Sequence, residues 1–184
     1  AFDDCLMSLG VMKHCIIVKY QNIIRKFQAI ALLLAVLLVG SNSFVLSPIL
    51  SDVAQGLSTQ PARIAWAISA FGAATAVAAF FLAGPIDRFP ANRVLGGAAI
   101  LLALAQVLSG ASQNWLWLCL SQALAGAAVG ILLPGTYATA AATAPKGREV
   151  ARLGLVLTGW AFSLVLAVPM AAFVTEQLGW GAVY

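Results

Sequence analysis

Long runs of apolar residues follow one another along the chain, and each is free of Asp, Glu, Lys and Arg. The five runs cover residues 27–50, 64–83, 94–111, 115–134 and 153–174, and the fourth has an apolar continuation to residue 142. A helix needs about 20 mostly apolar residues to cross the hydrocarbon core of a bilayer. We therefore predict an all-α fold of five membrane-spanning helices, joined by connections too short to hold a soluble domain.

The connections between the runs carry residues that end one helix and start the next. Ser58-Thr59-Gln60-Pro61 is a helix cap with proline in the first turn, and Gly84-Pro85 and Pro145-Lys146-Gly147 close apolar runs. Another segment begins at Gly179-Trp180-Gly181 and predicts a sixth span that is truncated at Tyr184. We expect the chain to be an N-terminal fragment of a longer membrane protein.

Lysine and arginine are divided unequally between alternate connections. If residues 1–26 form a cytoplasmic N-terminal arm, the outer side holds Arg63 alone and the inner side holds the other nine basic residues. These nine are Lys13, Lys19, Arg25, Lys26, Arg88, Arg93, Lys146, Arg148 and Arg152. Because short cytoplasmic loops are rich in Lys and Arg, we predict that the N-terminus is inside and that residues 27–184 form a transmembrane bundle.

Composition excludes several classes of protein. The 184 residues are 62% hydrophobic and 9% charged, with a mean hydropathy of +0.97. A soluble domain is about half apolar and one quarter charged, so neither a soluble fold nor a disordered chain fits. The three cysteines lack the spacing of metal ligands and His14 is the single histidine, so we expect no metal site and no cofactor. The net charge of +4 is a topology signal and does not indicate nucleic-acid binding.

The connection after the second run carries Asp87-Arg88 and, five residues later, Arg93. This stretch resembles the cytoplasmic signature of the major facilitator superfamily, in which a glycine is followed by Asp-Arg, a second glycine and basic residues. The chain departs from the signature at the two glycine positions and at two basic ones, which are Ala83, Pro90, Ala91 and Asn92. The resemblance implies that Asp87 and its basic neighbours latch the inner helix ends. Alternatively, Arg88 and Arg93 serve only to set the topology.

Three other stretches are similar to the same family. Residues 40–54 look like the first helix and outer loop of its drug and sugar (arabinose) efflux branch, which often carries an acid at the position of Asn42. Residues 122–130 look like a helix-four signature with Gln122 in place of its leading arginine, and residues 159–169 look like a helix-five antiporter pattern. The resemblance implies a half-bundle of major-facilitator type in the plasma membrane, with a small-molecule substrate and a missing C-terminal helical bundle.

A few polar and aromatic side chains interrupt the apolar runs. Asn42 and Gln122 are expected about 12 and 10 Å from the outer ends of their spans, at 1.5 Å per helical residue. An amide that faces lipid is costly, so each amide faces another helix or a wet cavity. For the pair we favour a shared polar patch on a substrate pathway, and the alternative for each is an interhelical hydrogen bond. Trp160 lines the same pathway or is a core or lipid-facing residue.

Small residues and prolines in the spans point to packing and bending. Gly126 and Gly130 form a Gly-x-x-x-Gly pair that allows another helix to approach closely. Gly159 belongs to the same class, and Pro169 is expected to bend its helix.

Three classes of function compete. We favour an efflux permease-like secondary transporter that works by alternating access, with the lipid bilayer and a small solute as its partners. A non-catalytic membrane scaffold or assembly subunit is the alternative. An intramembrane enzyme is disfavoured, because the spans lack histidine and the chain lacks serine-protease, metalloprotease and nucleotide-binding motifs. No carboxylate lies within a span, so proton coupling is implied by the family resemblance alone.

Overall fold

The computed structural model describes residues 24, 27–86 and 89–184, with the backbone alone for 83–86. Its regular elements are helices. They are a first helix over Phe27–Val45, α2 over Leu50–Gly56, α3 over Pro61–Ile86, α4 over Ala91–Gly110, α5 over Trp115–Ala142, α6 over Glu149–Leu178, and the 3-10 helix η1 over Trp180–Val183. The first helix and α3 to α6 are long and apolar enough to cross a membrane. The expected all-α fold with five spans is therefore confirmed. The expected arm, residues 1–26, lies outside the described part except for Ile24.

The first helix is shorter than the sequence analysis predicts, because it ends at Val45 and not at Leu50. Residues 46–49 form a turn, and α2 begins at Leu50. Pro48 explains the difference, since proline has no backbone N–H and disfavours a helical conformation in the residue before it. The proline breaks the helix, where the sequence analysis counted it within the span.

The last two spans are longer than predicted. α5 passes Pro134 and continues to Ala142, along the apolar continuation noted in the sequence. α6 begins at Glu149, four residues before the expected start. The Glu149 carboxylate accepts a hydrogen bond from the backbone N–H of Gly147 over 3.1 Å. Its negative charge in the first turn also interacts favourably with the helix dipole, so both effects stabilise the earlier start. Where the sequence analysis expects the start of a sixth span, residues 180–183 form the short helix η1, so the sixth span stays a prediction.

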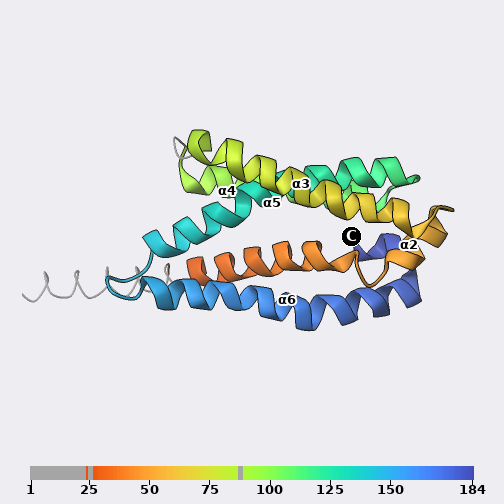
Figure 1. Ribbon diagram of the computed structural model, residues 1–184. Helices are drawn as coiled ribbons and strands as arrows, with labels where there is room; N and C mark the ends of the chain where they lie inside the picture. Colours follow the sequence, from red (N-terminus) through yellow and green to blue (C-terminus); the bar gives the residue numbers. More distant parts are fainter. Residues whose placement is uncertain (1–23, 25–26, 87–88) are drawn as a thin grey trace, which may run out of the picture.

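The spans form two groups that α5 connects (Figure 1). α3 and α4 both pack along α5, and α5 also contacts α6. The first helix lies beside α6. η1 follows α6 and turns back to contact α4 and α2.

Burial identifies α5 as the central helix. In its most apolar stretch 50% of the residues are buried, against 17–22% for α3, α4 and α6. Many large apolar side chains on the outer helices are exposed, among them Phe80, Phe81, Val165 and Phe173. Exposed apolar surface on every outer helix fits a protein whose solvent is lipid.

Candidate functional site

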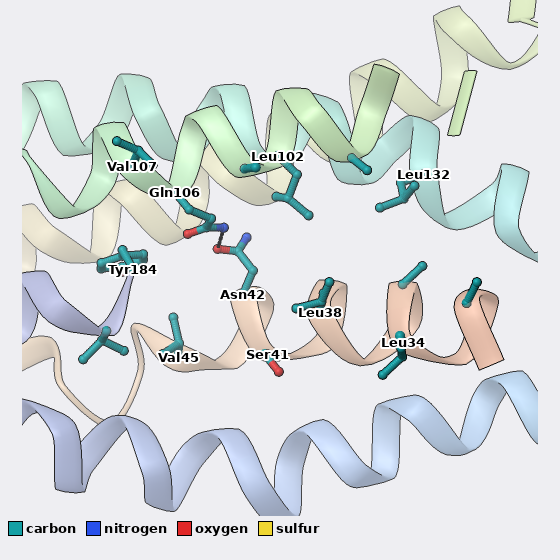
Figure 2. Close-up of a pocket in the computed structure, with 15 residues that line it drawn as sticks. Leu34, Leu38, Ser41, Asn42, Val45, Leu102, Gln106, Val107, Leu132 and Tyr184 are labelled. Carbon is teal, nitrogen blue, oxygen red and sulfur yellow. Dashed lines mark hydrogen bonds between the residues drawn. The ribbon is translucent and has the colours of Figure 1, made fainter. Parts of the chain in front are cut away.

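A cavity of about 750 Å³ lies between the first helix and α4, and η1 closes one end of it (Figure 2). Most of its lining is apolar, with polar side chains from four residues. The apolar lining is Ala31, Leu34, Ala35, Leu38, Val45, Ala99, Leu102, Ala103, Val107, Leu132 and Val183, and the polar lining is Ser41, Asn42, Gln106 and Tyr184.

Two amide side chains meet across this cavity. Gln106 Nε2 on α4 donates a hydrogen bond to Asn42 Oδ1 on the first helix (Figure 2). Asn42 lies three residues before the end of its helix and Gln106 four residues before Gly110, about 5 and 6 Å along the two helices. The sequence analysis placed Asn42 about 12 Å from a helix end because it extended the helix to Leu50. It also missed Gln106, although Gln106 is the one amide in the apolar run 94–111.

Two buried polar groups of the cavity have no hydrogen-bond partner among the described residues. They are Nδ2 of Asn42, whose side chain is 8% exposed, and the hydroxyl of Tyr184. A phenol hydroxyl keeps its proton at neutral pH, so the hydroxyl of Tyr184 can donate a hydrogen bond. An unsatisfied buried donor costs about 1–3 kcal/mol, so both groups favour a neighbour that offers an acceptor.

Gln122 belongs to a different network, between α4 and α5. Its Nε2 donates to Ser109 Oγ over 3.2 Å, and Ser109 Oγ donates to Ser121 Oγ over 3.0 Å. Gln122 is 2% exposed, and the described cavity lining does not include it. Asn42 and Gln122 were expected to share one polar patch, but the structure places them in separate hydrogen-bonded pairs. Asn42 pairs with Gln106 and Gln122 pairs with Ser109, and both partners lie on α4.

Trp160 joins three helices near the middle of α6. Its indole Nε1 donates to the Tyr137 hydroxyl on α5 over 2.8 Å. Its ring meets Phe44 of the first helix edge-on, with centroids 5.7 Å apart and an interplanar angle of 75°. All three rings are half-buried. We call Phe44, Tyr137 and Trp160 the aromatic cluster. Tyr137 is a second residue that the sequence analysis missed, because it lies beyond the predicted end of its span.

The aromatic cluster and the amide pair lie on opposite sides of the first helix. Phe44 follows Asn42 by two residues, which is about 200° around a helix with 3.6 residues per turn. Asn42 points toward α4 (Figure 2), whereas Phe44 contacts Trp160 on α6. The bundle therefore presents two separate regions that can bind a partner or ligand.

The Gly-x-x-x-Gly pair of α5 is a helix-packing device. A Cβ at Gly126 would strike the Phe71 carbonyl of α3, and a Cβ at Gly130 would lie 2.5 Å from the Thr75 carbonyl. Glycine thus lets the two backbones touch. Gly159 of α6 does the same against the first helix, where its Cβ would lie 2.8 Å from the Leu33 carbonyl.

Pro169 lies inside α6, and the helix continues through it to Leu178. Between α3 and α4, Arg93 lies exposed in the first turn of α4. Asp87 and Arg88 lie outside the described residues, so the expected latch stays a prediction.

A second cavity of about 470 Å³ lies between α2 and the end of α6. Its lining includes the carboxylates of Asp52 and Glu176 and the indole of Trp180. It is the more polar of the two cavities.

Five apolar helices packed through glycine contacts, with lipid-compatible outer faces, define a polytopic integral membrane protein. The sequence profile described as the Major Facilitator Superfamily matches residues 32–184. The chain therefore belongs to the Major Facilitator Superfamily, which is a family of membrane transporters and not of enzymes.

Two relatives come from Bacillus subtilis (strain 168). The uncharacterized MFS-type transporter YwfA is 28% identical over 152 residues, which are 83% of this chain and 37% of YwfA. The uncharacterized MFS-type transporter YbcL is 22% identical over 147 residues, which are 80% of this chain and 38% of YbcL. The chain thus spans less than half the length of these relatives.

Proposed function

We propose that the chain forms the first helical bundle of a secondary active transporter that moves a small solute across the plasma membrane by alternating access. The observation that carries this proposal is the family match over residues 32–184, supported by five spans in one bundle. Relatives more than twice as long indicate that the rest of such a carrier supplies the second bundle. Carriers of this kind rock two bundles about a central site.

We place the substrate pathway along the aromatic cluster. Trp160 lies 11 residues into the 30-residue α6, close to its middle, and substrate sites of such carriers lie near the bilayer midplane. The three half-buried rings come from three helices, so a relative movement of these helices would change the contacts that the cluster makes with a ligand. The Tyr137 hydroxyl accepts the Trp160 indole N–H and keeps its own hydrogen to donate to a ligand, and the aromatic faces offer apolar contact. Apolar and aromatic side chains with a few polar groups are typical of small-molecule sites. An efflux direction remains part of the proposal because of the sequence resemblance.

The test is transport by the full-length protein in proteoliposomes, with ethidium and radiolabelled arabinose as probes of the drug and sugar classes. We expect movement of at least one probe, and a severalfold higher KM in Trp160→Ala. Trp117→Ala, which changes an exposed tryptophan in the first turn of α5, is the matched control and should leave KM unchanged. If Trp160→Ala moves the probe with an unchanged KM, the pathway lies elsewhere. If neither probe nor a wider panel of sugars and cationic drugs is moved, the efflux proposal fails.

A further inference from the structure

The second cavity, of about 470 Å³, gathers negative charge where α2 and the end of α6 lie side by side (Figure 1). Asp52 of α2 and Glu176 in the last turn of α6 both line it. Among the described residues, neither carboxylate has an ion-pair or hydrogen-bond partner. Two like charges in one cavity repel each other, and the negative end of the α6 dipole also disfavours Glu176. A cation in the cavity would relieve both effects.

The basic side chains of the described residues lie elsewhere. The guanidinium carbon of Arg63, in the first turn of α3, lies 5.7 Å from the centroid of the Trp115 ring, and the described cavity lining does not include Arg63. The other described bases lie at or just before the starts of α4 and α6, which are the helix ends remote from the cavity, and they are Arg93, Lys146, Arg148 and Arg152. The charge of the cavity is therefore left for an external cation to balance.

An indole ring forms part of the cavity wall. Trp180 of η1 is half-buried and lines the cavity. A Cβ on Gly56, the last residue of α2, would strike the indole Nε1 of Trp180. Glycine at this position thus lets the ring lie against the α2 backbone, which fixes the ring in place. Tryptophan is the aromatic side chain that attracts a cation most strongly.

Thr175 adds a hydroxyl group without a partner. It lies beside Glu176 on α6 and lines the cavity, and its Oγ1 is buried with no hydrogen-bond partner among the described residues. Earlier on the same helix, the hydroxyls of Thr158 and Ser163 each donate to the carbonyl three residues before them. A buried polar atom that lacks such a bond favours a ligand that supplies one.

The size and the chemistry of the cavity favour an organic cation over a metal ion. Its volume falls within the range of about 300–1,000 Å³ that is typical of small-molecule sites, and Pro48 and Ile49 add apolar surface to the wall. In the part of the chain that the structure describes, no group of three or more His, Cys, Asp and Glu side chains could hold a metal ion. A ligand with a hydrocarbon body and a positive charge matches this lining.

We propose that this cavity binds an organic ammonium cation, whose N–H groups donate to Asp52, Glu176 and Thr175 while its charge lies near the indole of Trp180. The site is separate from the aromatic cluster, because Trp160 and Glu176 are 16 residues apart on α6, or about 24 Å. In the predicted topology the cavity opens at the outer surface. A free amine in the medium and the headgroup of phosphatidylethanolamine both carry the required chemistry there.

Binding of tritiated phenethylamine to the full-length protein in dodecyl maltoside tests the site, since this detergent carries no amine. We expect saturable binding that weakens with added salt. The Kd should rise severalfold in Asp52→Asn and in Glu176→Gln, and binding should be lost in the double variant. Both substitutions keep the side-chain shape at exposed positions, so the fold should be retained. Glu149→Gln removes an exposed carboxylate at the other end of α6 and is the matched control, which should leave the Kd unchanged.

Competition experiments identify the source of the cation. Stronger displacement of the probe by phosphatidylethanolamine than by free ethanolamine indicates a lipid headgroup, and the reverse order indicates a free amine. Either order supports an ammonium site.

Three results overturn the proposal. Unchanged binding in the double variant means that the two carboxylates do not hold the probe. Displacement by uncharged 2-phenylethanol as strong as by unlabelled phenethylamine means that the cavity recognises only the ring. Displacement by calcium at concentrations far below those of the amine means that the cavity is a metal site. None of these readouts needs transport, so they can fail while the transport test succeeds, or the reverse.

Discussion

The indole nitrogen of Trp160 lies 2.8 Å from the hydroxyl oxygen of Tyr137, and this hydrogen bond ties α6 to α5. The edge-on contact with Phe44 ties the same indole to the first helix. One side chain thus connects three spans near the middle of the bundle. In the proposed alternating-access cycle, this contact has to persist or to be exchanged for another.

Trp160→Phe and Tyr137→Phe should each lower the free energy of unfolding, because each removes the same hydrogen bond. Polar contacts between membrane helices contribute about 0.6 kcal/mol on average, so we expect a coupling of that size in a double-mutant cycle. SDS-induced unfolding in mixed micelles measures it. Purely additive losses would show that the two side chains act independently. Trp117→Phe is the control for the loss of an indole.

Gly126→Ala should destabilise the protein by about 1–3 kcal/mol, since the added methyl group meets the Phe71 main chain, which cannot move without moving α3. Gly96→Ala is the matched control in α4, because a Cβ there meets nothing within 4 Å. The control should be neutral or slightly stabilising, as alanine is the better helix former. Thermal unfolding in detergent checks both variants. Equal midpoints would contradict the close contact between α5 and α3.

Gln122→Leu should weaken the contact between α4 and α5 by about 1 kcal/mol or less, because it removes the bond to Ser109. Ser109→Ala removes the same bond together with the bond to Ser121, so its loss should be the larger. The KM for a transported probe should stay unchanged in Gln122→Leu. A raised KM at normal stability would instead place Gln122 on the substrate pathway, as the sequence analysis favoured.

Asn114→Ala should cost about 1 kcal/mol, because Asn114 Oδ1 accepts the backbone N–H of Trp117 over 2.8 Å and caps the central helix α5. Asn114→Asp should keep most of the stability, since aspartate caps a helix equally well. The unfolding midpoint in detergent distinguishes the two substitutions. A similar loss in both would mean that the cap contributes little. Gln113→Ala, one residue earlier, is the control for a change in the same loop.

The sequence analysis predicted the start of α5 correctly but placed the end of the first helix too late. The predicted start at Trp115 is confirmed, and Asn114 directly before it is a favoured capping residue. Pro48 also indicated that the first helix ends near Val45. The sequence analysis nevertheless extended the helix to Leu50, because the sequence stays apolar up to that residue. Hydropathy reports whether a segment tolerates lipid, and it does not report whether the backbone stays helical.

The number of spans and the membrane environment were determined by the sequence alone, because about 20 consecutive apolar residues is a property of one segment that needs no neighbour. Which side chains meet was decided by the tertiary structure. Asn42 bonds to Gln106 and Gln122 to Ser109, although Asn42 and Gln122 were expected to share a patch. Partners depend on how each helix is rotated and which helix lies beside it, and an apolar sequence constrains both weakly. Glycine contacts such as Gly126 on Phe71 fix that rotation and that neighbour only when the whole bundle assembles.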